Sequence, residues 1–257
     1  MNTSSPSVNS IDRALKVIET LHEADGELGV AEIARAIDEY QSTVFRTLAT
    51  LEARGFVYQN NQTSKYGLGM KLYTIGMGIK NNSVIVKIIE PFAKELCERF
   101  GETVNVSIRD YECKDDYYSL LMHQESKKGQ VLGVSQTVGN ITLCYYSAVG
   151  KALLAYSDDF STERILRGHF KRFTENSITD PDEILKELYR IRRQGYALDN
   201  EEQEIGLFCV ACPVFDARQN IKAAISVSGL VTRMKEIGVQ TIVESLQEKC
   251  HEIGRLL

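Results

Sequence analysis

The spacing of the apolar residues changes at Gly55, and this change constrains the fold of the N-terminal region more than any other feature. Before Gly55 the apolar residues recur every three or four positions, which predicts helices that each bury one face. After it, Phe56–Gln59 and Lys65–Leu68 read as two strands around a polar turn. The order of helix, helix-turn-helix and hairpin is the layout of a winged helix-turn-helix.

Three helices are expected before Gly55. Ser10 can cap the first, and the second is short. The tight turn Asp38-Glu39-Tyr40 precedes the third, which Ser42 or Thr43 can cap. The inward residues of the three helices are Ile11, Leu15, Ile18 and Leu21, then Val30, Ile33 and Ile37, then Val44, Leu48 and Leu51.

The exposed face of the third helix suits contact with a DNA groove. Ser42, Ala49 and Thr50 are small and allow close approach, and Arg46 beside them can reach a phosphate or a guanine edge. The alternative is a three-helix bundle that only packs. The short second helix, the tight turn and a basic wing tip at Lys65 favour DNA.

The distribution of charge agrees with a local DNA-binding surface. The whole chain carries a net charge of -5, and residues 1–40 hold three basic and eight acidic side chains. Residues 41–80 hold five basic side chains and one acidic one, which gives this stretch a charge of +4. A basic stretch in an acidic chain can bind phosphate, although a solvated face could have the same composition.

The composition predicts a cytoplasmic protein without membrane contact. Hydrophobic residues make up 43% and charged residues 25% of the 257 residues, as in ordinary globular chains. No stretch approaches the roughly 18 apolar residues that a membrane span needs, and Met1–Ser10 lacks the apolar core of a signal peptide. The six cysteines have no framework spacing and are expected to be reduced thiols.

The second part of the chain is expected to be a mixed α/β domain with hairpin-linked, mainly antiparallel strands, joined to the first by a helical linker. Pro91 fits the first turn of a further helix or kinks one. The expected strands are 103–108, 117–122, short segments near Val131 and Thr142, 208–215 and 221–228. The expected helices are 148–156, 181–193, which Gly195 ends, and 235–257.

The segment Ser147–Gly150 opens a helix and is a candidate anion site. The N–H groups of Ala148 and Val149 have no partner in the first turn of a helix and can bind a carboxylate. An ordinary helix start capped by Ser147 is the other interpretation. Gly150-Lys151 is not a phosphate-binding P-loop, because the earlier glycine and the following hydroxyl residue of that motif are missing.

Ser226 and Ser228 lie in an otherwise apolar strand and point to the same face. An unpaired buried hydroxyl costs roughly 1–3 kcal/mol, so these two are expected to bind protein groups, water or a polar ligand. Cys209 and Cys212 have the C-x-x-C spelling, but residues three apart in a strand face opposite sides and cannot share a metal. Asp199, in an acidic run, could accept a hydrogen bond from a ligand hydroxyl.

Recognisable catalytic motifs are missing from the sequence. The four histidines are far apart and none lies in a nucleophile or metal motif, so neither a metal nor a cofactor is expected. An enzyme that uses Cys209 with Asp199 is an alternative, although no base is placed to activate the thiol. A sensor or oligomerisation module without DNA binding is another, suggested by the acidic turn Asp38-Glu39.

Separated segments over almost the whole chain resemble the IclR family of transcriptional regulators. Each segment is short, but their order and spacing together are highly specific. In the first part they are Ser10–Leu15, Ser42–Arg46, Tyr66–Gly69 and Lys71-Leu72. In the second part they are Gly101–Val104, Gly150–Ala155, Gly195–Glu202, Pro213–Asp216 and Ser226–Gly229.

The resemblance implies an α+β fold with three parts. A winged helix-turn-helix at residues 7–69 (helix-turn-helix about 30–54, wing 56–68) is followed by a linker helix at 70–82 and a GAF-like effector-binding domain at 83–257. The expected protein is a homodimer or dimer of dimers that binds double-stranded operator DNA and acts as a repressor rather than an activator. The residues expected to contact DNA are Gln41, Ser42, Thr43, Arg46, Thr47 and Lys65.

The resemblance also implies a small carboxylate effector. The amides of Ala148 and Val149 would hold its carboxylate, and four side chains would complete the pocket, those of Asp199, Cys209, Ser226 and Ser228. The segment 199–206 looks most like regulators of sugar-acid catabolism, such as those that sense 2-keto-3-deoxygluconate, so a sugar acid or keto acid is expected.

The chain departs from the family pattern in two places. Glu39-Tyr40-Gln41 replaces the usual lysine or small residue before the Ser-Thr pair, which makes the leading end of the third helix less basic. The loop Cys113–Lys128 is charged and irregular where the family has a simpler hairpin.

Overall fold

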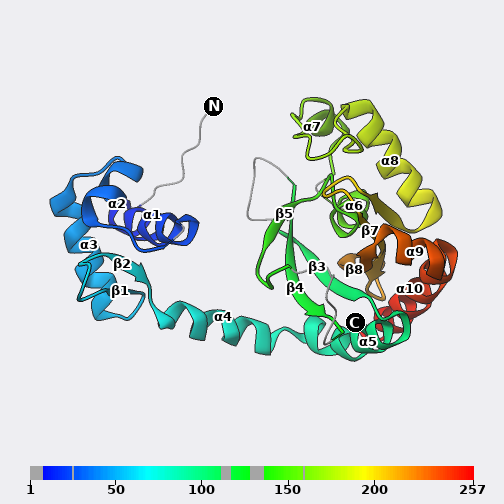
Figure 1. Cartoon of the computed structure of the whole chain (residues 1–257), viewed down its shortest axis with the longest axis horizontal. Helices are drawn as coiled ribbons and strands as arrows, with labels where there is room; N and C mark the ends of the chain where they lie inside the picture. Colours follow the sequence, from blue (N-terminus) through cyan, green and yellow to red (C-terminus); the bar gives the residue numbers. More distant parts are fainter. Residues whose placement is uncertain (1–7, 25, 111–116, 128–135, 159) are drawn as a thin grey trace. The chain divides into compact units, whose positions relative to one another are not determined.

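A computed structural model describes residues 8–24, 26–110, 117–127, 136–158 and 160–257 of the chain. The chain forms two compact units, Met1–Asn82 and Ser83–Leu257 (Figure 1). The segment near Val131, part of the loop Cys113–Lys128 and the turn residue Asp25 fall outside the described residues.

The first unit has the predicted order of helix, helix-turn-helix and hairpin (Figure 1). Strands β1 and β2 pair antiparallel, with Val57 opposite Leu68 and Gln59 opposite Tyr66. The core holds the predicted inward residues of the second and third helices, including Ile33, Val44 and Leu48. The elements are α1 (Asn9–Glu23), α2 (Val30–Ala36), α3 (Gln41–Ala53), β1 (Val57–Gln59), β2 (Tyr66–Leu68) and α4 (Met70–Asn82).

The predicted helix caps of this unit are wrong. Helix α1 follows Val8 and helix α3 follows Tyr40, and neither of these residues makes a side-chain cap bond. The entry to α3 is fixed from the preceding turn instead, because Asp38 takes a left-handed conformation with φ 54° and the Arg13 guanidinium lies 2.8 Å from Glu39. The pairing compensates the charge of Glu39 just before α3.

The predicted inward face of α1 is also wrong in part. Val17 and Leu21 are the buried residues of this helix, whereas Ile11 and Leu15 are more than half exposed. The helix therefore carries two apolar stripes, of which only one packs into its own unit. Periodicity alone does not tell which stripe the chain itself covers.

The second unit is built on an antiparallel sheet whose strand order, among the described residues, is β5-β4-β3-β8-β7-β6. The strands are β3 (Thr103–Asp110), β4 (Tyr118–Glu125), β5 (Ile141–Leu143), β6 (Ala197–Asn200), β7 (Leu207–Phe215) and β8 (Ile221–Leu230). The helices are α5 (Val84–Phe100), α6 (Ala148–Ala155), α7 (Thr162–Leu166), α8 (Pro181–Gln194), α9 (Val231–Ile237) and α10 (Val239–Gly254).

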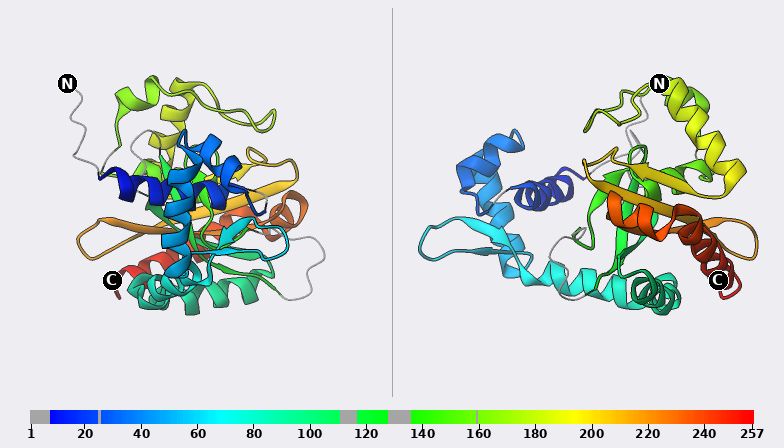
Figure 2. Two further views of the ribbon diagram at one scale, coloured as in Figure 1. Left: turned by 90° about the vertical axis from the view of Figure 1, so that its left-hand side faces the viewer. Right: turned by 45° about the vertical axis from the view of Figure 1, so that its right-hand side comes forward.

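Helices cover both faces of this sheet (Figures 1 and 2). Helices α5, α9 and α10 pack on one face, which we call the outer face, and α6 and α8 pack on the other, the inner face. Strand alternation divides β7 between the two cores, so that Cys209 faces the inner core and Cys212 the outer core.

Three details of this unit differ from the sequence expectations. The closing helix is two helices, α9 and α10, because Gly238 at φ 93° interrupts the helical backbone. Pro91 lies inside α5, so of its two expected placements the one in the first turn is wrong. Strand β6 and helix α7 have no counterpart among the expected elements, since each is too short for an apolar pattern to be recognised.

Candidate functional site

The exposed face of α3 presents Gln41, Ser42 and Arg46 to solvent. Thr43 and Thr47 lie at the edge of the buried face, and the Thr47 hydroxyl donates to the Thr43 carbonyl oxygen at 3.1 Å. The structure therefore brings the first three together as a free polar strip, while Thr47 already uses its hydroxyl within the helix.

Lys65 does not lie at the tip of the wing, where a DNA contact would be easiest. Its ammonium is 3.4 Å from the Glu32 carboxylate of α2, which compensates part of its charge. The tip is the turn 60–64, and Glu27 holds it by accepting hydrogen bonds from the side chains of Asn60 and Thr63. Those bonds, the one from Asn60 foremost, lower the pKa of Glu27.

In the second unit, four buried side chains form a cross-strand row on the inner face of the sheet. Thr103 of β3 is opposite Ser228 of β8, which is opposite Cys209 of β7, which is opposite Asp199 of β6. All four are buried. Three of the predicted effector residues thus share one line across four strands.

A second row adjoins the first and adds residues that the sequence did not single out. Gln124 donates to Asn105 at 2.8 Å, Asn105 donates to Ser228 at 3.3 Å, and the hydroxyls of Ser226 and Ser228 are 3.1 Å apart. The available signal was the polar series at alternate positions of β3, Thr103, Asn105 and Ser107, a pattern that a strand with one face in water also shows. The structure buries all three.

The N-terminus of α6 has the free amides that an anion needs. Ser147 caps the helix by accepting from the Gly150 N–H at 3.1 Å. Among the described residues, no acceptor is assigned to the N–H groups of Ala148 and Val149. Gly150 is required here because a Cβ would lie 2.5 Å from the Cα of Cys144. The buried helix packs against the inner core that also contains Cys209.

A buried ion cluster lies beside this row. Lys151 is 2% exposed, and its ammonium is 2.5 Å from Glu202 and 3.9 Å from Glu187. One oxygen of Asp199 accepts from the Glu202 N–H at 2.8 Å, while the other is buried without a hydrogen-bond partner. Arg190 reaches Glu187 from the surface at 2.6 Å. The buried ammonium of Lys151 therefore compensates two carboxylates, and through Glu202 it fixes the turn that follows Asp199.

Burial sets the protonation of the side chains in this row. It raises the pKa of Asp199 from 3.8 to about 7, against the opposing effect of Lys151. Burial, followed by the charge of Asp199, raises the pKa of the Cys209 thiol well above its ordinary value. A thiol held protonated is a poor nucleophile, which argues against the enzyme that would use Cys209.

Two family models match the chain. The model described as the C-terminal domain of bacterial IclR transcriptional regulators matches residues 77–255, and the IclR helix-turn-helix domain matches residues 10–61. The chain belongs to the IclR family.

Relatives in the IclR family cover nearly the full length of the chain. It is 32% identical to the HTH-type transcriptional regulator KdgR of Escherichia coli over 255 residues, which cover 96% of this chain and 92% of KdgR. It is also 32% identical to BhcR of Paracoccus denitrificans over 248 residues, 96% of this chain and 86% of BhcR. These relatives are named transcriptional regulators, so the chain is a DNA-binding transcriptional regulator rather than an enzyme.

Solved structures of the IclR family have the same fold. An IclR regulator from Alicyclobacillus acidocaldarius superposes with a TM-score of 0.83 at 26% identity, covering 97% of this chain and 98% of that one. The Thermotoga maritima IclR superposes with a TM-score of 0.74 at 29% identity and the same coverage. The expected α+β architecture, with an N-terminal helix-turn-helix and an antiparallel C-terminal sheet, is confirmed.

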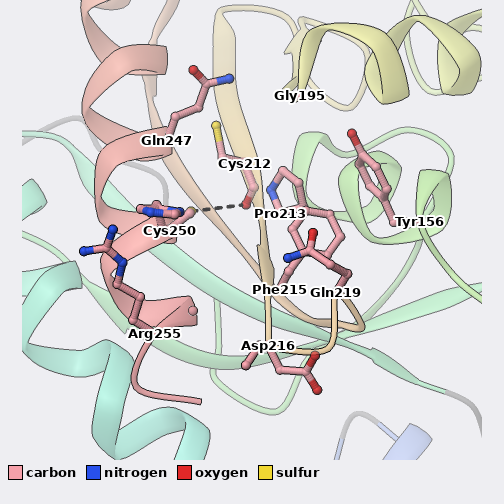
Figure 3. Close-up of a pocket in the computed structure, with 13 residues that line it drawn as sticks. Tyr156, Gly195, Cys212, Pro213, Phe215, Asp216, Gln219, Gln247, Cys250 and Arg255 are labelled. Carbon is pink, nitrogen blue, oxygen red and sulfur yellow. Dashed lines mark hydrogen bonds between the residues drawn. The ribbon is translucent and has the colours of Figure 1, made fainter.

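A hollow elsewhere in the second unit contains none of the predicted effector residues. It has a volume of about 330 Å³ and lies between α10 and the end of β7, with Tyr156 on its far side (Figure 3). Cys250 donates to the Cys212 carbonyl oxygen at 3.8 Å along its wall. The described residues include no group of histidine, cysteine and carboxylate side chains that could hold a metal, and no helix long and apolar enough to cross a membrane.

Proposed function

We propose that this IclR-family regulator is a repressor that binds operator DNA through α3 and the β1-β2 wing, and that a small carboxylate bound on the inner face of the sheet changes its affinity for DNA. The observation that carries the effector site is the buried polar row, because hydroxyl and carboxylate groups there replace the apolar residues that a core would prefer. Relatives named as repressors, AllR of Salmonella typhi and IclR of Escherichia coli, support the sign of the effect.

The proposed effector is a hydroxy or keto acid. The amides of Ala148 and Val149 supply donors for its carboxylate, and the free oxygen of Asp199 supplies an acceptor for a hydroxyl. Ser226 and Ser228 can turn their hydroxyls toward either kind of group. In support, a solved structure of the same fold from Microbacterium hydrocarbonoxydans is a complex with 4-hydroxybenzoate, which carries both groups.

The proposed assembly is a homodimer, or a dimer of such dimers. Its support is the second apolar stripe of α1, with Ile11 and Leu15, and a helix α4 that buries none of its residues while exposing Tyr73 and Ile79. A dimer can place two α3 helices in successive major grooves, roughly 34 Å apart. Sedimentation of the intact chain at micromolar concentration tests the proposal, and a monomer would contradict it.

The Arg46→Ala variant should bind the operator more weakly by about 1–3 kcal/mol if Arg46 reads a base. Arg46 is exposed on α3, where its guanidinium can reach DNA. Titration of labelled operator fragments at fixed salt measures the change. Arg167→Ala is the matched control, since that exposed arginine pairs with Glu163 in the second unit. Unchanged operator affinity in a folded Arg46→Ala protein would refute the assignment.

The double variant Ser226→Ala, Ser228→Ala should lose its response to the effector and keep its affinity for DNA. The two hydroxyls bond to each other, and that of Ser228 also accepts from the Asn105 side chain, so the exchange removes the hydrogen-bonding groups at the centre of the polar row. Calorimetry with those keto and hydroxy acids that the wild type binds measures the loss. Ser245→Ala, a buried serine on α10, is the control. Normal effector affinity in the double variant would sink the proposed pocket.

A further inference from the structure

Phe45 is an exposed aromatic side chain on the face of α3 that we assign to DNA. It is 55% exposed, while Val44 and Leu48 on the opposite face are fully buried. A phenyl ring that stays exposed to water contributes no hydrophobic stabilisation to the fold. The same ring would bury a large apolar area if a partner covered it. Phe45 therefore adds apolar surface to a strip that is otherwise polar.

The neighbours of Phe45 limit what this strip can enter. Ser42, Arg46 and Ala49 are three or four residues from it or from one another and are all exposed, so they form one strip with it. Ala49 leaves room for close approach, and Arg46 brings a positive charge. A narrow strip of small, basic and apolar groups fits the edges of bases in a major groove, where the thymine C5-methyl is the apolar group.

Charge indicates that the occupant of this strip is DNA rather than a second copy of the chain. The strip carries the positive charge of Arg46 and no acidic side chain, so it suits a partner that bears phosphates, whereas two copies of it would bring like charges together. The apolar stripes suited to self-association lie elsewhere, on α1 and α4, with Leu15 and Tyr73 among their exposed residues.

We propose that Phe45 is a specificity-determining residue that contacts the C5-methyl group of one thymine in each operator half-site. The inference rests on the proposed entry of α3 into the major groove. It adds to that function a base preference carried by apolar contact instead of a hydrogen bond.

The test uses the full-length protein and DNA selected from random duplexes. Each thymine of the enriched sequence is replaced singly by deoxyuridine, which removes only the methyl group. For the wild type, removing the methyl group of one particular thymine in a half-site should lower the affinity for the duplex about fourfold. Removing it in both half-sites should lower the affinity more than tenfold. Phe45→Ala should bind the thymine and deoxyuridine duplexes equally, and Phe45→Leu should retain part of the preference.

Two control variants separate this contact from other effects. Arg46→Ala should weaken binding to both duplexes and leave their ratio unchanged. Tyr40→Ala removes another exposed aromatic residue, the one before α3, and should also leave the ratio unchanged. Sedimentation of Phe45→Ala should match the wild type, and a lower oligomeric state with an unchanged ratio would assign Phe45 to a protein interface and overturn the proposal.

The outcomes distinguish this inference from the function on which it rests. An enriched sequence whose thymine-to-deoxyuridine ratios are the same for the wild type and Phe45→Ala overturns the role of Phe45 alone. The role of Phe45 is also overturned if Tyr40→Ala changes the thymine-to-deoxyuridine affinity ratio as much as Phe45→Ala does. Failure to enrich any sequence overturns operator binding through α3, and the role of Phe45 with it.

Discussion

Replacing Lys151 by methionine should lower the free energy of unfolding of the second unit by about 3–5 kcal/mol. The ammonium is 2% exposed and lies within 4 Å of Glu202 and Glu187, so its removal leaves carboxylates buried without a cation. Breaking such a cluster from one side costs far more than the intact cluster contributes, because the remaining charges have lost their water. Urea unfolding at pH 7, followed by circular dichroism, measures the loss.

Two further variants test the cause of this loss. Lys186→Met removes an exposed ammonium 2.6 Å from Glu183 and should change stability little, since water screens an exposed ion pair. Adding Glu202→Gln to Lys151→Met removes one uncompensated carboxylate and should restore part of the stability. If Lys151→Met were no less stable than Lys186→Met, the cluster would not be the buried network described here.

The second large effect concerns pH. Because burial raises the pKa of Asp199 to about 7 in the folded chain, the folded state holds a proton there that the unfolded state releases near pH 3.8. Asp199 therefore stabilises the fold most below about pH 4, and this contribution is lost as pH rises towards 7. At about 1.4 kcal/mol for each pH unit between the two pKa values, the decline reaches about 4 kcal/mol.

The variant Asp199→Asn should lack this decline. Its free energy of unfolding, measured from pH 4 to pH 8, should exceed that of the wild type by a margin that grows with pH and levels off above 7. Asp216→Asn is a control of opposite sign. The hydrogen bond from the Asn220 backbone N–H, foremost among several, lowers the pKa of Asp216, so the stability that Asp216 contributes is lost only in acid. Parallel pH profiles for the wild type and Asp199→Asn would show that Asp199 is ionised in the fold.

The sequence predicted the elements whose pattern is long and repeated. The helix-turn-helix follows from the spacing of Ile33, Val44 and Leu48, all of which the structure buries. Strand alternation correctly separated Cys209 from Cys212. The exposure of Ile11 and Leu15 could not be predicted, because an apolar stripe looks the same whether its own chain or another molecule covers it.

The candidate effector site was predictable only where a polar residue interrupts an apolar strand. Ser226 and Ser228 are such interruptions, and their cross-strand neighbours follow once the register is known. Thr103 and Asn105 alternate with valines as they would in a half-exposed strand, so the pattern alone does not show that their side chains are buried. Their burial depends on α6 covering the inner face, which is a long-range contact that no local spacing encodes.

Helix α4 has a consequence for how the regulator searches DNA. None of its residues is buried, and it contains Gly76 and Gly78, each of which weakens a helix by roughly 0.5–1 kcal/mol relative to alanine. A methyl group added at either glycine would meet no atom within 4 Å, so nothing in the chain itself demands them. We expect this segment to become rigid only when another subunit covers it. In a single subunit, α4 would then join the DNA-binding unit to the rest of the chain flexibly. In the proposed dimer, a rigid α4 would fix the distance between the two half-sites that the regulator can bind.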